Sequence, residues 1–412
     1  MARILAYTSP ALGHVFPLVP GLLELQRRGH SVHVRTLPAA IPHLASAGLE
    51  ASPVDPRVLD VEVTDYRARS NKDRLVSGLS DVMQRAGYDG PDLDSAIAEH
   101  HPDLLVVDAN AYGALTRAEV SGLPWALALP SLLPLRGRGI PPYSLGLPPA
   151  RGPLGRIRDA ILWPLVERAY GKAMLPGLNR VRRDSGLADL HSPLDLYDRP
   201  NLVLGLTGEP LEYDRSDLPA HVRLVGFQPW DPPAETPAYL DEPGADWVLV
   251  SCSTDYQGDE SLAQAAAVGL RGEPYRVLIT LADAFEGAGL VSADNIVVTR
   301  FVPHAPVLQR AAAVVTHSGM GIVGKATRAG VPIVAVPYGR DQPEIARRVS
   351  EAGAGVRLPA AELTPERLRS AVRQAVALRP RTAAAVDQQP QHPEQSFADA
   401  VLELSRSARV TS

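Results

Sequence analysis

The sequence has a single cysteine, Cys252, among 412 residues, and it has only three lysines. One cysteine excludes an internal disulfide and a metal site built from several cysteines, and it favours a reducing, cytoplasmic location. No run of 18 or more apolar residues occurs, so we predict no membrane-spanning helix. The first residues enter a strand pattern at once, so no signal peptide is expected. The net charge of −5 gives no reason to expect nucleic acid or an anionic membrane as a partner.

The remaining composition is that of a globular chain long enough for two domains. Hydrophobic residues make up 45% and charged residues 21% of the sequence, which are ordinary values. Residues 228–244 are dense in proline and acid, as is typical of an inter-domain linker. We therefore predict an N-terminal domain at 1–227, a linker at 228–244, a C-terminal domain at 245–380 and a tail with one more helix at 381–412.

Both halves alternate apolar strand patterns with helical patterns, which predicts an α/β fold with parallel sheets. In the first half, Arg3–Thr8 and Leu104–Asp108 are examples of the predicted strands. Between them, residues 74–85 and 92–100 predict two helices, with Asp92 as a cap of the second. Two halves of similar architecture favour two facing Rossmann-like domains with a cleft between them.

The most informative stretch is Ala313–Gln342, which predicts a strand–helix–strand unit. An apolar strand pattern leads into the small-residue turn His317–Gly321, and a helix pattern follows to about Arg328. The first N–H groups of such a helix have no partner within the helix, and they lie at the positive end of its dipole. Glycines in the turn let a ligand approach this backbone closely. The turn therefore predicts a site for a phosphate or a diphosphate.

The same turn allows a second interpretation. Gly319, Gly321 and Gly324 have the G-x-G-x-x-G spacing of a dinucleotide-binding fingerprint, and Asp341 follows further along the chain. An NAD(P)-dependent oxidoreductase is therefore an alternative. The fingerprint normally follows the first strand of its domain, whereas other strand patterns precede this turn. Its position in the chain disfavours the alternative without excluding it.

Two residues at strand ends are candidates for acid–base chemistry. His14 lies at the entrance of a helix pattern, after the first strand and a glycine turn. Asp108 ends another strand, at the edge where open α/β sheets bind ligands. A histidine at such an edge is well placed as a general base, and it equally fits a capping or surface group. For Asp108, the alternative role is to cap the helix that follows.

These motifs resemble those of the GT-B glycosyltransferases of family 1, in particular the bacterial antibiotic and natural-product enzymes of the UDP-glucuronosyl- and UDP-glucosyltransferase type. The resemblance extends over nearly the whole chain. Its most specific part is Arg300–Gln342, with F-V-P, T-H-x-G-x-G and D-Q in that order. Further support comes from Gly13–Pro17, from Asp108 and from Val250–Thr254, which is similar to the donor-side loop of the family.

The resemblance implies an inverting glycosyltransferase. It moves a sugar from a dTDP- or UDP-sugar to a hydroxyl of a hydrophobic natural product, such as a polyketide, a macrolide or an aromatic aglycone. His14 is then the general base, and Asp108 orients its imidazole. The family implies no metal and no cofactor beyond the nucleotide sugar. Tyr66, Tyr112 and Trp125 are candidates for the acceptor site, although such residues more often pack in a core. A homodimer is compatible with the sequence.

The family also implies which residues hold the donor. Phe301 stacks on the base, the backbone of Val302 reads its edge, and His317 donates to a phosphate. Asp341 and Gln342 contact hydroxyls of the sugar. The diphosphate is held by the turn and by the loop after the first strand of the second domain, through Ser318, Gly319, Met320, Gly321, Ser253 and Thr254.

Three positions depart from the pattern of the family. Ile322 stands where many relatives carry Thr or Ser, and Ser253 replaces a common glycine. Lys325 stands where many carry Glu, and we expect it either to pair with a phosphate or to face solvent. These departures keep a catalytically weakened homologue open, which would bind a sugar nucleotide as a partner protein. An epimerase of nucleotide sugars with a related architecture is a further alternative.

Overall fold

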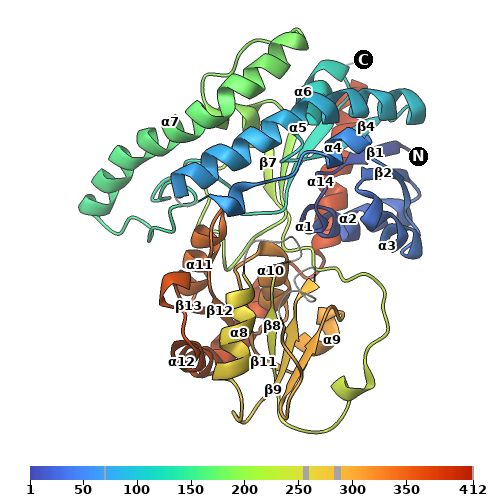
Figure 1. The fold of residues 1–412 in the computed structure, drawn as a ribbon. Helices are drawn as coiled ribbons and strands as arrows, with labels where there is room; N and C mark the ends of the chain where they lie inside the picture. The colour runs from blue at the N-terminus through green and yellow to red at the C-terminus, as the bar shows by residue number, and fades with distance from the viewer. Residues whose placement is uncertain (69–70, 254–258, 283–288, 411–412) are drawn as a thin grey trace.

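The computed structural model describes residues 1–68, 71–253, 259–282 and 289–410, which form two α/β lobes (Figure 1). The first lobe contains a seven-stranded sheet in the order β3-β2-β1-β4-β5-β6-β7. The second contains a six-stranded sheet in the order β10-β9-β8-β11-β12-β13. The described strands pair in parallel throughout both sheets. The predicted α/β class, with a parallel sheet in each half, is confirmed.

Apolar sequence runs form the strands, and helices cover both faces of each sheet. All five residues of the central strands β4 and β8 are buried, as expected for parallel strands that are covered on both sides. The first sheet comprises β1 Arg3–Tyr7, β2 Ser31–Thr36, β3 Glu50–Pro53, β4 Leu104–Asp108, β5 Trp125–Leu129, β6 Leu202–Gly205 and β7 Val222–Leu224. The second comprises β8 Trp247–Ser251, β9 Arg276–Thr280, β10 Ile296–Thr299, β11 Ala311–Thr316, β12 Ile333–Ala335 and β13 Gly355–Arg357.

The helices follow the strands in the alternating order that the sequence predicts. In the first lobe they are α1 Leu12–Val15, α2 Val19–Arg27, α3 Ile41–Ser46, α4 Pro56–Leu59, α5 Asn71–His100, α6 Tyr112–Ser121 and α7 Pro153–Asp184. In the second lobe they are α8 Glu260–Gly269, α9 His304–Leu308, α10 Met320–Arg328, α11 Gln342–Glu351, α12 Pro365–Val376 and α13 Arg379–Ala384. Short 3-10 segments include η1 Phe16–Leu18, η3 Asp65–Arg67 and η5 Ala238–Leu240, and α14 Pro393–Val410 ends the described chain.

Each sheet has one point at which the order of the strands reverses. In the first sheet this point lies between β1 and β4, and in the second it lies between β8 and β11. Open α/β sheets bind ligands in the crevice beyond the carboxyl ends of the strands at such a reversal. The topology therefore draws attention to the loops that follow these four strands, and they carry most of the predicted site.

The last helix of the chain returns to the first lobe. Helix α14 lies beside α2 (Figure 1), and Phe397 is fully buried in the core of that lobe. A Cβ on Gly21 of α2 would lie 2.2 Å from the ring of Phe397, so only glycine fits at this contact. The chain thus passes between the lobes twice, once through residues 228–244 and once before α14.

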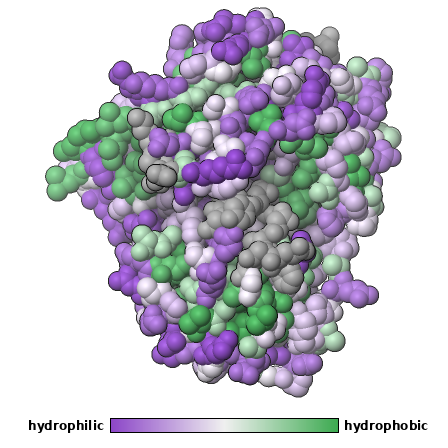
Figure 2. Space-filling model, viewed as in Figure 1, coloured by the Kyte–Doolittle hydropathy of each residue, from purple (hydrophilic) through white to green (hydrophobic). Residues whose placement is uncertain are grey.

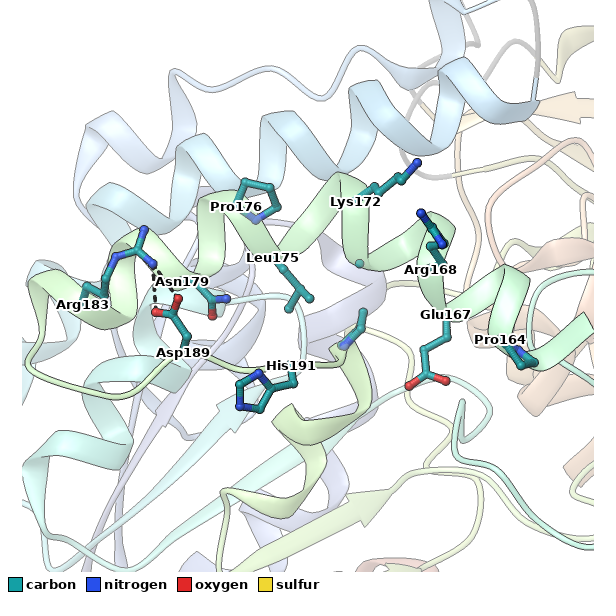
Figure 3. Close-up of a pocket in the computed structure, with 12 residues that line it drawn as sticks. Pro164, Glu167, Arg168, Lys172, Leu175, Pro176, Asn179, Arg183, Asp189 and His191 are labelled. Carbon is teal, nitrogen blue, oxygen red and sulfur yellow. Dashed lines mark hydrogen bonds and ion pairs between the residues drawn. The ribbon is translucent and has the colours of Figure 1, made fainter.

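Helix α7 runs along the outside of the first lobe, and it has two surface features. A groove of about 710 Å³ separates it from residues 189–193 (Figure 3). Charged side chains there pair with one another, as Arg183 does with Asp189 at 2.7 Å, and none of the predicted site residues lines the groove. Nearer the start of the helix, a hydrophobic area at the left of Figure 2 contains four exposed side chains, Leu154, Ile157, Ile161 and Leu165.

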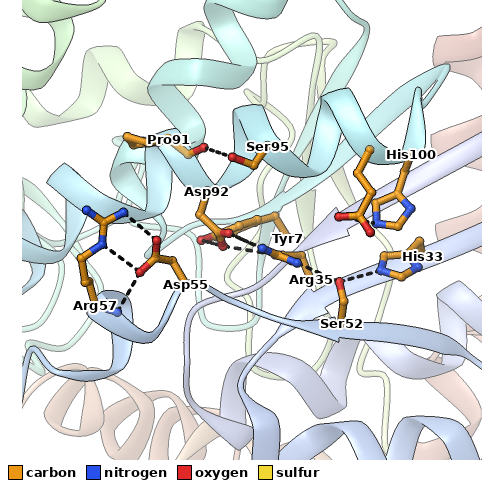
Figure 4. Close-up of polar contacts among 11 residues, drawn as sticks. Tyr7, His33, Arg35, Ser52, Asp55, Arg57, Pro91, Asp92, Ser95 and His100 are labelled. Atoms are coloured by element: carbon orange, nitrogen blue, oxygen red, sulfur yellow. Dashed lines mark hydrogen bonds and ion pairs between the residues drawn. The ribbon is translucent and has the colours of Figure 1, made fainter.

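Residues 71–100 form one continuous helix, α5, so the prediction of two helices with Asp92 as a cap is wrong. Pro91 lies inside this helix. Asp92 points from it toward the sheet, where it accepts hydrogen bonds from Arg35 Nη2 at 2.5 Å and from Tyr7 Oη at 2.9 Å (Figure 4). Asp92 therefore lies in the interior of α5, where it forms a buried ion pair with Arg35 and does not cap a helix.

Among the described residues, no helix combines the length and the apolar character that a bilayer crossing requires.

Candidate active site

His14 and Asp108 meet at the reversal point of the first sheet. His14 follows β1, and Asp108 is the last residue of the neighbouring strand β4. His14 Nδ1 lies 2.9 Å from Asp108 Oδ2. The Asp108 side chain is fully buried, whereas 27% of the His14 side chain is exposed. The structure therefore brings the two predicted residues together, with the imidazole partly open and the carboxylate behind it.

The other oxygen of Asp108 is also held. Its Oδ1 accepts hydrogen bonds from the Ser9 hydroxyl and, at 2.9 Å, from the backbone N–H of Asn110. Because a carboxylate only accepts hydrogen bonds, its contact with His14 places the ring proton on Nδ1 and leaves a lone pair on Nε2. Asp108 thus fixes both the orientation and the tautomer of the ring.

Asn110 belongs to this site, although the sequence analysis missed it. Its amide nitrogen lies 3.2 Å from His14 Nε2, on the side of the ring opposite Asp108. An asparagine two residues after a strand-terminal aspartate has the pattern of a turn, in which the aspartate accepts the N–H of residue i+2. That pattern predicts the backbone contact of Asn110 but not the contact of its side chain.

The predicted anion turn lies at the reversal point of the second sheet. Residues 317–319 connect β11 to α10, and Gly319 is the N-cap of that helix. Ser318 has a φ of +76°, which few non-glycine residues adopt, and its buried hydroxyl has no hydrogen-bond partner among the described residues. A buried hydroxyl beside unpaired helix N–H groups is suited to a ligand that accepts hydrogen bonds.

His317 packs tightly into the same turn. It is 7% exposed, and burial lowers the pKa of its ring, so the ring is neutral at pH 7. A Cβ on Gly319 would lie 2.4 Å from His317 Nε2, so glycine is needed for the ring to occupy this position. A Cβ on Gly321 would meet no atom within 4 Å from the described residues outside its own helix.

The loop after β8 approaches this turn through an acidic residue that the sequence analysis missed. Asp259 is 1% exposed, and its Oδ2 accepts the N–H of Ser253 at 2.7 Å. The same oxygen lies 3.8 Å from His317 Nδ1. Asp259 thus joins the donor loop to the anion turn, whereas in the sequence it is an ordinary residue before a helix. Thr254, the other predicted residue of this loop, lies outside the described residues.

The predicted base-binding residues are adjacent but differ in exposure. Phe301 is 44% exposed, which is unusual for a large apolar side chain, and its ring is available to a planar ligand. Val302 is 2% exposed and belongs to the core of the second lobe. The burial of the Val302 side chain holds its backbone in place beside Phe301. The resemblance assigns recognition of the edge of the base to this backbone.

Asp341 and Gln342 lie at the start of α11, in the loop that follows β12. Gln342 Oε1 accepts the N–H groups of Tyr338 and Gly339 at 2.7 and 3.2 Å, so this oxygen stabilises the loop itself. Asp341 Oδ2 accepts the hydroxyl of Ser131, which belongs to the first lobe, at 2.6 Å. The two predicted sugar-binding residues therefore lie where the lobes meet.

Lys325 pairs with the linker and is largely buried, so the expectation that it faces solvent is wrong, and the expectation of a phosphate contact stays a prediction. Its Nζ lies 2.5 Å from Oδ1 of Asp231, in the linker, and both side chains are largely buried. Burial and the nearby ammonium group together lower the pKa of His304 to about 4. Ile322 packs into the core of the second lobe, where a hydroxyl would be poorly placed.

The three acceptor candidates occupy different environments. Trp125 is 3% exposed at the first residue of β5, the end of the strand opposite the ligand edge, so it packs in the core and does not line the crevice. Tyr112 begins α6 and packs against the same core. The hydroxyl of Tyr66 lies 3.0 Å from Glu62 at the surface of the first lobe.

The linker lies against both halves of the site. The Trp230 ring lies 5.0 Å from the ring of Phe16, two residues after His14. Phe227 contacts α10, where a Cβ on Gly324 would lie 3.0 Å from its ring. The segment that carries His14 and the helix that follows the anion turn therefore contact nearby residues, Trp230 at the start of the linker and Phe227 just before it. Within the described part of the chain, no three His, Cys, Asp or Glu side chains converge as a metal site would require.

Comparisons with known proteins agree with this architecture. Residues 274–395 match the family described as erythromycin biosynthesis protein CIII-like, C-terminal domain. The chain is 31% identical to 4'-demethylrebeccamycin synthase of Lentzea aerocolonigenes, over 90% of this chain and 91% of that protein. It is 27% identical to 3-alpha-mycarosylerythronolide B desosaminyl transferase of Saccharopolyspora erythraea, over 90% of each chain.

Solved structures give the same result for the fold. The glycosyltransferase VinC in complex with dTDP superposes with a TM-score of 0.69 at 23% identity, over 99% of this chain and 100% of that chain. The spinosyn rhamnosyltransferase SpnG, complexed with thymidine diphosphate, has a TM-score of 0.70 at 20% identity, over 96% and 98%. The fold is therefore GT-B. The chain belongs to the family of antibiotic and natural-product glycosyltransferases, and the oxidoreductase and epimerase alternatives are set aside.

Proposed function

We propose that the chain transfers a sugar from a dTDP- or UDP-sugar to a hydroxyl of a hydrophobic natural product, with inversion at the anomeric carbon. The observation that carries this proposal is the contact of 2.9 Å between His14 and Asp108 at the ligand edge of the first sheet. It supports a ring with its proton on Nδ1 and a lone pair on Nε2, which is the form that a general base needs.

The proposed reaction is a single displacement. The acceptor oxygen bonds to the anomeric carbon while the bond from that carbon to the diphosphate oxygen breaks, and the hydroxyl proton passes to Nε2 of His14. Asp108 is poorly suited to act as a nucleophile in a two-step reaction. It is fully buried, and both of its oxygens already accept hydrogen bonds. A single displacement inverts the configuration of the carbon.

The leaving diphosphate gains negative charge as the bond breaks. We assign the stabilisation of this charge to the first N–H groups of α10, the buried hydroxyl of Ser318 and a neutral His317, which would donate one hydrogen bond. In this proposal no divalent metal is required. Transfer measured after treatment with a chelator is therefore expected to keep its rate, and a loss that Mg²⁺ or Mn²⁺ restores would contradict this part.

The relatives inform the choice of substrates. VinC and SpnG were solved with dTDP, which favours a dTDP-sugar over a UDP-sugar as the donor. The relatives named above act, by name, in the synthesis of 4'-demethylrebeccamycin and on 3-alpha-mycarosylerythronolide B. We therefore propose a bulky, largely apolar acceptor for this chain too.

Calorimetry and a base variant test the proposal together. The native chain is expected to bind dTDP or UDP, and to transfer sugar to at least one member of a panel of polyketide, macrolide and aromatic acceptors. His14→Ala should lower kcat by about 10²–10⁴-fold and keep the affinity for the nucleotide. The control is His392→Ala, since the His392 side chain is 63% exposed on the tail. Undiminished transfer by His14→Ala would exclude the proposed base.

A further inference from the structure

The first lobe contacts three of the five residues of Tyr338–Gln342, the segment where the connection from β12 enters α11. This segment, the 338–342 loop, contains the two residues proposed to contact the donor sugar. Residues 338, 340 and 341 each bind a different segment of the first lobe, far away in the sequence. The loop is thus a part of the second lobe whose conformation depends on contacts from the first.

The first contact is an ion pair between Arg340 and Asp65. Arg340 Nε and Nη2 donate to the two carboxylate oxygens of Asp65 at 2.8 and 2.7 Å, and the Asp65 side chain is 8% exposed. Such a two-bond contact fixes the direction of both side chains as well as their distance. Arg340 has a φ of +55°, a conformation that non-glycine residues rarely adopt without support from their surroundings. The ion pair is a direct source of that support.

The second contact joins Arg74, in the first turn of α5, to the backbone of the loop. Arg74 Nη1 donates to the carbonyl oxygen of Tyr338 at 2.7 Å. A Cβ on Gly339 would lie 3.1 Å from the same nitrogen, a tight contact that glycine avoids. The Arg74 side chain thus lies directly against the backbone of the loop.

The third contact reaches the proposed sugar ligand itself. Ser131, two residues after β5, donates its hydroxyl to Asp341 Oδ2 at 2.6 Å. The hydroxyl of Tyr143, from the long loop before α7, lies 3.2 Å from Ser131 Oγ. One oxygen of Asp341 is thus held by the first lobe, and the other is left to accept a hydrogen bond from a sugar hydroxyl.

The loop has an internal support as well, but it covers only part of the segment. Gln342 Oε1 accepts the N–H groups of Tyr338 and Gly339. The side chains of Arg340 and Asp341, in contrast, contact Asp65 and Ser131 of the first lobe. The carboxylate that is proposed to contact the sugar is thus held from across the boundary between the lobes.

We propose that Asp65, Arg74 and Ser131 are positioning residues for the donor sugar, because they place the 338–342 loop when the first lobe closes on it. The proposal rests on the proposed function, in which Asp341 contacts the sugar. It implies that the acceptor lobe contributes to recognition of the sugar without touching it. The nucleotide itself, which the anion turn and Phe301 would hold, should not depend on these three residues.

The test separates the placement of the loop from the binding of the nucleotide. Asp65→Asn and Ser131→Ala are compared with the native chain by hydrogen exchange of peptides that cover 338–342, by calorimetry with dTDP and UDP, and by kcat and KM for the donor. We expect exchange in 338–342 to become about tenfold faster in Asp65→Asn. The nucleotide Kd should stay within about twofold, and kcat/KM for the donor should fall by about 10- to 100-fold, mainly in kcat.

A second ion pair between the lobes provides the matched control. Arg151 lies 2.8 Å from Glu351, with Arg151 81% exposed, and it does not contact the loop. Arg151→Ala should change none of the three measurements. The Asp65–Arg340 pair is tested with a double variant. Asp65→Asn combined with Arg340→Gln should change the three measurements no more than either single variant does, because each single variant already breaks the same contact.

The outcomes distinguish this proposal from the proposed function. Unchanged exchange at 338–342 in Asp65→Asn and Ser131→Ala would overturn the positioning role, whatever the activity. A parallel loss of nucleotide affinity and of donor kcat/KM would also overturn it, because the effect would then be a general one on the second lobe. Failure of the proposed function has a different result, namely no nucleotide binding by the native chain. Faster exchange with an unchanged kcat/KM would overturn the link to the sugar.

Discussion

Replacing Asp108 with Asn is the sharpest test of the proposed chemistry. The side chain keeps its shape, but it loses its negative charge, and an NH₂ group replaces one carboxylate oxygen. In the native chain, Oδ1 accepts hydrogen bonds from Ser9 and from the Asn110 N–H, while Oδ2 faces His14 Nδ1. The amide oxygen of Asn can keep the first two contacts. Its NH₂ group then faces Nδ1 and donates, so the ring must accept there and carry its proton on Nε2.

The expected magnitude follows from this change of tautomer. With its proton on Nε2, the imidazole no longer has the lone pair that takes the proton of the acceptor. A positioned base contributes about 10²–10⁴ in rate, and the loss corresponds to about 3–5 kcal/mol in the barrier. Asp108→Asn should therefore lower kcat by this factor. The affinity for dTDP or UDP should be unchanged, because the proposed nucleotide site lies in the other lobe.

The assay is transfer at saturating donor and acceptor, with the nucleotide Kd measured by calorimetry on the same preparation. Asp103→Asn is the matched control, because Asp103 directly precedes the same strand at its opposite end and is 45% exposed. It should keep full activity. The reasoning is refuted if Asp108→Asn keeps kcat within about threefold of the native value, or if its kcat and nucleotide affinity fall together.

Three further predictions concern the rest of the molecule. Gly319→Ala should weaken nucleotide binding, measured by calorimetry, about tenfold, because the new methyl group displaces the His317 ring. Gly321→Ala should keep the melting temperature of the native chain in a thermal melt. Lys325→Met should leave the nucleotide Kd within about twofold, because the ammonium group pairs with the linker, and a large loss would indicate a phosphate contact. Burial raises the pKa of Asp89 from 3.8 to about 8, so its contribution to stability is present below pH 4 and is lost as the pH rises toward 8. Asp89→Asn should remove this fall, which is on the order of a few kcal/mol, and thermal melts between pH 5 and 8 should show a flatter profile than the native chain.

The sequence was sufficient for the fold class because the central strands, such as β4 and β8, are apolar runs that alternate with helical patterns in both halves of the chain. It failed at α5, where Pro91 and Asp92 have the pattern of a break and a cap. The structure continues the helix through both residues. Its packing on α6 and the ion pair of Asp92 with Arg35 stabilise the whole segment, and neither contact is visible from local sequence.

The candidate site also shows that local sequence patterns do not reveal contacts between distant residues. His14, Asp108 and the turn at 317–321 were found because each follows a strand at the ligand edge, so topology alone brings them to the crevice. The partner of Lys325 was not predicted because it lies 94 residues away, in a linker that has no pattern of its own. Asn110 was missed because its side chain contacts His14, which follows a different strand and lies 96 residues away in the sequence.

The contacts between the lobes lie furthest from what a sequence pattern can reveal. The partners of Arg340 and Asp341 are 275 and 210 residues away, and each is one polar residue among many. No periodicity distinguishes them, because a single hydrogen bond imposes no repeat on the chain. Such contacts become visible only when the relative position of the two lobes is known.

A buried charged cluster at the boundary between the lobes suggests why the closed arrangement is unique. Arg348 is 1% exposed, its Nε lies 2.9 Å from Glu344 Oε1, and its Nη1 lies 3.4 Å from Oε2 of Glu212 in the first lobe. Its guanidinium carbon lies 3.5 Å from the centre of the Tyr213 ring. Buried ion pairs contribute little net stability, because desolvation offsets most of their attraction, but they penalise every arrangement in which a charge loses its partner. The cluster therefore favours one register of the two lobes. An enzyme that must align two substrates from two lobes needs such a defined register.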